Sequence, residues 1–96
     1  MKLEIQSAAD GGGLQLAGDL DIYGVESLRE ALLARFGAVD EIVLDLGRVE
    51  NCDAAGLQLL LAARRKAVEG ARVLHFRNVS AAIRTCGDRL GLPASL

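Results

Sequence analysis

The segment Ile42-Val43-Leu44-Asp45-Leu46 constrains the fold more than any other part of the chain. It is short, almost continuously apolar and rich in branched side chains, which is typical of a β-strand covered on both faces. Segments with apolar residues at helical spacing lie on either side of it. A strand between helices predicts parallel strands joined by right-handed helical crossovers, with this strand at the centre of the sheet.

Helices are predicted on both sides of the central strand and again near the C-terminus. The first follows Gly18-Asp19-Leu20-Asp21 and stops at Gly37. Its apolar positions are Val25, Leu28, Leu32 and Leu33. The last has Ser80 as a possible N-cap. Its apolar positions are Val79, Ile83, Cys86 and Leu90.

A helix from about Ala54 to Val68 follows the central strand, with Asp53 as N-cap and Gly70 at its end. A helical wheel places Leu57, Leu60, Leu61 and Val68 on the inward face, with Arg64 inside this stripe. The opposite face carries Ala55, Leu59, Ala62 and Lys66. Leu59 has no obvious core to enter there, so we interpret this face as a candidate contact patch, although single exposed leucines are common.

The remaining strands are predicted from alternating apolar residues. Leu3 and Ile5, then Leu14 and Leu16, predict a hairpin with its turn at residues 9–13. The glycines of this turn lead into a strand and not into a helix with a Lys-Ser or Lys-Thr pair, so they do not indicate a phosphate-binding loop. Residues 72–76 form a further strand, and residues 93–96 a short tail. The order β-β-α-β-α-β-α predicts an α/β fold with a mixed sheet of about four strands.

Length and composition narrow the class of protein. A chain of 96 residues has room for one core, so we expect a single domain over residues 1–96. Acidic and basic residues are interleaved, the net charge is −2, and no basic stripe indicates nucleic-acid binding. The chain has no signal-peptide run and no apolar segment of membrane-spanning length, so we expect it in the cytoplasm and not inserted in a membrane.

Candidate catalytic and metal-binding residues are sparse. Cys52 and Cys86 lack CxxC spacing, which in a reducing compartment favours two buried apolar thiols over a disulfide. His75 is the only histidine, and the carboxylates do not cluster with it as metal ligands usually do. No nucleophile and base are paired in the sequence. We therefore predict no metal, no cofactor and no enzymatic activity.

Two segments resemble the STAS family, which is named for sulfate transporters and anti-sigma factor antagonists. Gly18-Asp19-Leu20-Asp21 and the helix after it resemble the family's Gly-x-Leu-Asp strand end and first helix. The strand at residues 42–46, with Cys52-Asp53-Ala54-Ala55-Gly56-Leu57 after it, resembles the family's most diagnostic stretch. Together with the order of elements, the resemblance covers nearly the whole chain and implies a STAS-like fold.

The resemblance implies a binding site at the start of the second predicted helix. In the antagonists an Asp-Ser-Ser-Gly-Leu or Asp-Ser-Thr-Gly-Leu sequence carries a phosphorylatable serine, and the added charge disrupts the partner's docking surface. This chain has alanine at both hydroxyl positions, Ala54 and Ala55, so it lacks the usual switch. The residues predicted to bind a partner are Asp21, Asp53, Ala54, Ala55, Leu59 and Ala62. Asp45 joins Asp21 and Asp53 in a predicted acidic rim, unless Asp53 is only a cap and Asp45 only a strand-end residue.

The implied function is that of a non-enzymatic signalling regulator of the anti-sigma factor antagonist kind. Its partner would be an anti-sigma factor kinase or a related signalling protein, and the alanine-containing motif looks similar to stand-alone STAS proteins of bacterial chemotaxis systems. The alternative is an accessory subunit of a membrane transporter, docked on its ATPase. A nucleotide-binding protein or hydrolase is a third hypothesis, and no motif in the sequence supports it.

Overall fold

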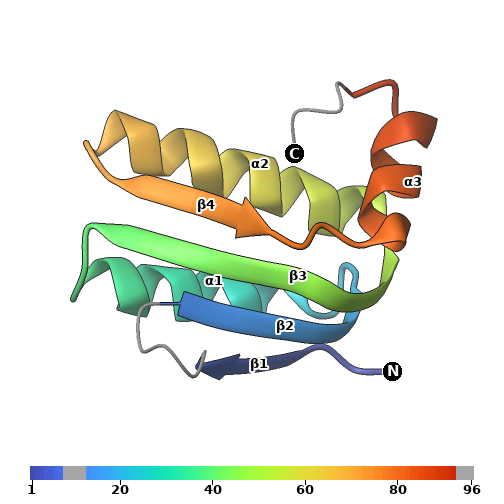
Figure 1. Ribbon diagram of the computed structural model, residues 1–96, viewed down its shortest axis with the longest axis horizontal. Helices are drawn as coiled ribbons and strands as arrows, with labels where there is room; N and C mark the ends of the chain where they lie inside the picture. Colours follow the sequence, from blue (N-terminus) through green and yellow to red (C-terminus); the bar gives the residue numbers. More distant parts are fainter. Residues whose placement is uncertain (8–12, 93–96) are drawn as a thin grey trace.

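The computed structural model describes residues 1–7 and 13–92, and over these ranges the chain forms four strands and three helices in the predicted order (Figure 1). The strands are β1 (Glu4–Ser7), β2 (Gly13–Leu20), β3 (Glu41–Cys52) and β4 (Val73–Arg77). The helices are α1 (Val25–Phe36), α2 (Ala54–Glu69) and α3 (Ala81–Arg89). The predicted α/β fold with a mixed four-stranded sheet is confirmed.

The sheet has the strand order β1-β2-β3-β4, in which β1 is antiparallel to β2 and the remaining pairs are parallel. Ile5 pairs with Leu16, so the two strands of the predicted hairpin are confirmed. Gly13 begins β2, and the rest of the predicted turn lies outside the described residues, as does the predicted tail. The strand predicted at the centre is β3, which lies between β2 and β4.

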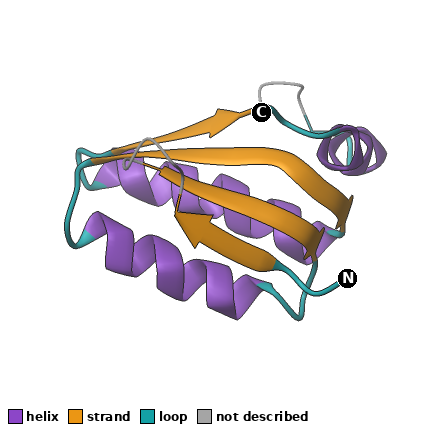
Figure 2. Cartoon of the chain, turned by 60° about the horizontal axis from the view of Figure 1, so that its bottom comes forward, coloured by secondary structure: helices purple, strands orange, loops and turns teal. Residues whose placement is uncertain are grey.

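Both long helices cover the same face of the sheet, while α3 stands at the end of the sheet near the carboxyl end of β3 (Figure 2). On β3, Ile42, Leu44 and Leu46 are fully buried. Val43 and Asp45, which alternate with them, are only half-buried. The prediction of cover on both faces is therefore wrong along much of β3, because no long helix lies over the second face.

The buried faces of α1 and α2 are narrower than the sequence predicts. Leu28 and Leu32 of α1 are buried, but Leu33 is 60% exposed. On α2, Leu57 and Leu60 are fully buried and Leu61 is half-buried. The inward stripe then ends on Ala67 and not on Val68, which is 69% exposed. Val68 is one residue, about 100°, around the helix from Ala67 and so points away from the sheet.

The observed state of the cysteines and of the capping residues agrees in most respects with the predictions from the sequence. Both cysteines are free thiols, with Cys86 buried and Cys52 half-buried. The Ser80 side chain accepts a hydrogen bond from the Ile83 backbone N–H at 3.4 Å and caps α3 as predicted. Among the described residues, no helix is both long enough and apolar enough to cross a membrane.

Leu60 provides a direct test of this packing. Its side chain is fully buried between α2 and the sheet, so Leu60→Ala should lower the free energy of unfolding by about 2–5 kcal/mol. The matched control is Val68→Ala on the exposed side of the same helix, which should change it by less than about 0.5 kcal/mol. Urea unfolding followed by circular dichroism measures both. Equal effects of the two substitutions would contradict the orientation of α2.

Candidate functional site at the start of the second helix

Asp53 joins the start of α2 to the loop between β2 and α1. Its Oδ1 accepts a hydrogen bond from the Gly56 N–H at 2.9 Å, which is the N-cap bond predicted from the sequence. Its Oδ2 accepts a hydrogen bond from the Ile22 N–H at 3.1 Å. One carboxylate therefore satisfies a free backbone donor of the first helical turn and fixes the neighbouring loop at the same time.

Gly56 allows α2 to begin directly against the end of β2. A Cβ atom at this position would lie 2.2 Å from the Leu20 carbonyl oxygen, which no side chain tolerates. The same carbonyl accepts a hydrogen bond from the Asp53 N–H at 3.2 Å. The glycine of the Asp-Ala-Ala-Gly-Leu sequence is thus required by a close backbone approach and not by an unusual backbone angle.

The loop between β2 and α1 is a tight turn that projects two apolar side chains. Asp21 Oδ1 accepts hydrogen bonds from the N–H groups of Tyr23 at 3.0 Å and Gly24 at 3.2 Å, an arrangement in which an aspartate stabilises its own turn. Tyr23 is 91% exposed and Ile22 61% exposed. The sequence analysis missed both residues. The signal was available, because two large apolar residues lie between an aspartate and a glycine at a turn.

The structure brings four of the predicted site residues together and separates the other two. Asp21, Asp53, Ala54 and Ala55 lie at or beside the start of α2, with Ala54 exposed and Ala55 half-buried. Leu59 and Ala62 lie further along α2, where they line a groove shared with α1. The prediction that Leu59 has no core to enter is wrong, because its half-buried side chain packs against the hydrophobic core.

Asp45 does not belong to the acidic rim predicted around the helix start. It lies in the middle of β3, which continues to Cys52, so it is not a strand-end residue either. Its carboxylate accepts hydrogen bonds from the Gly47 N–H at 2.9 Å and from Asn78 Nδ2 at 3.2 Å. Asp19, the last residue but one of β2, lies nearer than Asp45 to the carboxyl ends of β2 and β3, and hydrogen bonds from Asn51 and from the Met1 amino group lower its pKa.

Cys52 and His75, whose side-chain types often act in catalysis, lie towards opposite ends of the sheet. Burial, and then the neighbouring Cys86 thiol, raises the pKa of Cys52 to about 12, so this thiol stays protonated at neutral pH. His75 lies towards the opposite end of the sheet, with Nε2 3.6 Å from Glu41 Oε2. Among residues 1–7 and 13–92, no three histidine, cysteine, aspartate or glutamate side chains are grouped as a metal site would require.

Comparison with known proteins identifies the family. Residues 3–94 match the family described as Mlab, STAS domain. The chain therefore belongs to the STAS family, as the sequence resemblance predicts. A search of curated protein sequences finds no significant match.

Solved structures share this fold at low sequence identity. The phosphorylated form of the Bacillus cell fate determinant SpoIIAA is similar with a TM-score of 0.67 and 23% identity, over 94% of this chain and 84% of that one. The unphosphorylated form of the anti-sigma factor antagonist SpoIIAA has a TM-score of 0.65 and 23% identity, over 86% of this chain and 78% of that one. Mglu has a TM-score of 0.60 and 21% identity over 77% of this chain, but the match spans only 19% of Mglu. At these identities the similarity extends to the fold alone.

Substituting Gly56 tests the close approach of α2 to β2. Gly56→Ala should lower the free energy of unfolding by about 1–3 kcal/mol, because the clash with the Leu20 carbonyl outweighs the higher helix propensity of alanine. Gly70→Ala is the matched control, since a Cβ there would meet no atom closer than 3.6 Å. Chemical denaturation measures both variants. If Gly56→Ala were as stable as Gly70→Ala, the start of α2 would not lie against Leu20.

The raised pKa of Cys52 predicts a slow reaction with alkylating reagents. At pH 8 the native thiol should react with iodoacetamide at least about tenfold more slowly than the thiol of the urea-unfolded chain, because little thiolate is present. The same shift makes folding less favourable as the pH rises above the ordinary thiol pKa of 9.0. Trypsin separates the two cysteines into different peptides, so mass spectrometry can follow Cys52 alone. Equal rates in both states would contradict its burial.

Proposed function

We propose that this chain is a non-enzymatic regulator that binds a partner protein through the start of α2 and the β2–α1 loop. We define the docking surface as Ile22, Tyr23, Asp53, Ala54 and Ala55, with Asp21 holding the loop in place. The partner we propose is an anti-sigma factor kinase or a related signalling protein, including one of a chemotaxis system. The whole domain, residues 1–96, is the binding unit.

The single observation that carries this proposal is the exposure of Ile22 and Tyr23 on a loop that is hydrogen-bonded to Asp53 at the start of α2. A 91% exposed tyrosine in a tight turn is an anchor of the kind that dominates binding energy at protein interfaces. Hydrogen bonds to Asp21 and Asp53 hold the backbone that carries it. A loop that is already ordered loses little conformational entropy on binding, which favours affinity.

Family membership and the fold shared with SpoIIAA support the class of partner. SpoIIAA is described as an anti-sigma factor antagonist and exists in phosphorylated and unphosphorylated forms. At Ala54 and Ala55 this chain has no hydroxyl to accept a phosphoryl group. We therefore propose that its docking surface stays in the unmodified, binding form whatever the local kinase activity, because no phosphate charge can be added there.

A second candidate is an accessory subunit of a membrane transporter, bound to the transporter's ATPase. The STAS family is named for sulfate transporters as well as for anti-sigma factor antagonists, so membership of the family supports this candidate too. Both candidates use the same docking surface. Capture of partners on immobilised chain from cell extract separates them, because a soluble kinase supports the first and a membrane ATPase complex the second.

Substituting Ala54 tests the docking surface. Ala54→Asp should weaken binding of the captured and purified partner, because it adds a carboxylate beside Asp53 on the exposed first turn of α2. The helix itself should be unchanged or stabilised by about 0.3–1 kcal/mol, because a negative charge is favourable at a helix N-terminus. Calorimetric titration and thermal unfolding measure the two effects. Unchanged affinity would show that the start of α2 is not part of the docking surface.

Tyr23→Ala provides an independent variant in the same titration. The side chain makes few contacts within the chain, so we expect unchanged stability and an affinity loss of about tenfold or more. Val68→Ala removes a comparably exposed apolar side chain from another part of the surface and is the matched control. Loss of affinity in both variants would show that exposed apolar area, and not this loop, determines binding.

A further inference from the structure

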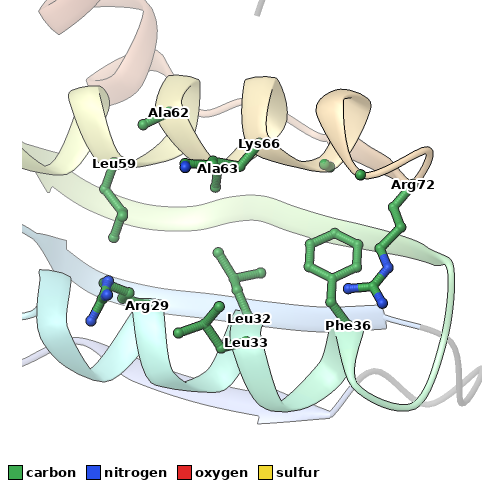
Figure 3. Close-up of a pocket in the computed structure, with 11 residues that line it drawn as sticks. Arg29, Leu32, Leu33, Phe36, Leu59, Ala62, Ala63, Lys66 and Arg72 are labelled. Carbon is green, nitrogen blue, oxygen red and sulfur yellow. The ribbon is translucent and has the colours of Figure 1, made fainter.

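The groove between α1 and α2 has features of a second binding surface. It has a volume of about 460 Å³ and an apolar lining (Figure 3). Leu32 and Ala67 are buried at its base, and Phe36, Leu59 and Ala63 are half-buried along it. Leu33 projects from α1 with 60% of its side chain exposed. An apolar groove with an exposed leucine beside it is the kind of surface that receives the apolar face of a helix.

The charged residues that line the groove all have the same sign. They are Arg29, Lys66 and Arg72, and no acidic residue in the described part of the chain lines the groove. Arg29 lies at one end and Arg72 at the other, with Lys66 on the α2 side between them (Figure 3). Their acidic neighbours are outside the groove and exposed: Arg29 pairs with Glu26 at 3.3 Å, and Arg72 with Asp40 at 3.9 Å. Such exposed pairs are weak, so these cations remain available to a negatively charged ligand.

Positive charge at both ends distinguishes between classes of ligand. A single-chain carboxylate, such as a fatty acid, has charge at one end only, so its apolar tail would end against the other arginine. A helix with acidic residues at both ends and leucines between them matches both arginines and the apolar lining. The stretch from Arg29 to Phe36 spans about 10 Å at the helical rise of about 1.5 Å per residue, which accommodates about two turns of such a helix.

We propose that the groove between α1 and α2 binds an acidic amphipathic helix of a partner protein. This surface differs from the docking surface at the start of α2, and the proposal does not depend on that surface. It assigns a role to Leu59 and Ala62, which the sequence predicts in a contact patch with Lys66 and which the structure places on the groove. A partner that used both surfaces would gain affinity from two linked contacts.

A model peptide tests the groove without knowledge of the natural partner. The probe is a fluorescein-labelled, end-capped peptide of about four helical turns with leucines at i, i+4 and i+7 and glutamates on both flanks. We expect saturable binding by fluorescence anisotropy that weakens as salt increases. Leu33→Glu and Lys66→Glu should each weaken it by at least about tenfold, because each places a carboxylate at the groove. Nuclear magnetic resonance shifts should concentrate on Leu32, Phe36 and Leu59.

Matched controls define the outcomes that would overturn the proposal. Val68→Glu places a carboxylate at an equally exposed apolar position outside the groove, and Ala54→Asp alters the start of α2, so both should bind the peptide normally. A peptide with lysine in place of each glutamate should bind at least about tenfold more weakly. Absence of binding, equal binding of the lysine peptide, or oleate binding in the groove where the acidic peptide does not bind would each overturn the proposal.

Discussion

The backbone contact between Gly56 and Leu20 sets the position of every part of the candidate site. Without a side chain at Gly56, the first turn of α2 lies against the last residue of β2. This contact brings Asp53 within hydrogen-bonding distance of Ile22 on the following loop. A larger residue would push α2 away from the sheet and break the link to the loop. The docking surface is therefore a consequence of helix and strand packing.

The carboxylate of Asp53 gives the site its rigidity. It accepts one hydrogen bond from α2 and one from the β2–α1 loop, while Asp21 accepts two from within that loop. These bonds hold the loop that carries the exposed Tyr23 against the start of α2, although an exposed aromatic side chain gains nothing for folding there. In the proposed docking surface, alanine at the helix start presents a methyl group where the resemblance implies a hydroxyl.

Three different surfaces of α2 have three different physical roles. Leu57 and Leu60 bury completely against the sheet and stabilise the domain. Ala54 and Ala55 form part of the proposed docking surface at the start of the helix. Leu59 and Lys66 face the groove beside α1, where an apolar lining meets positive charge. Because these surfaces share one rigid helix, a partner bound at its start and a helix bound in the groove would be held at a constant spacing.

Local signals in the sequence were sufficient for the elements and their order. Apolar periodicity located the helices and strands, and Asp53 and Ser80 identified two helix starts because capping depends only on nearby residues. Asp21 and Ala54 were assigned to the proposed site by the family resemblance and not by local signals. Local signals failed for Leu33, Val68 and Asp45, because burial depends on how each element lies against the others. Only the tertiary structure, with both long helices on one face of the sheet, determined the placement of Leu59 beside α1 and the positively charged groove.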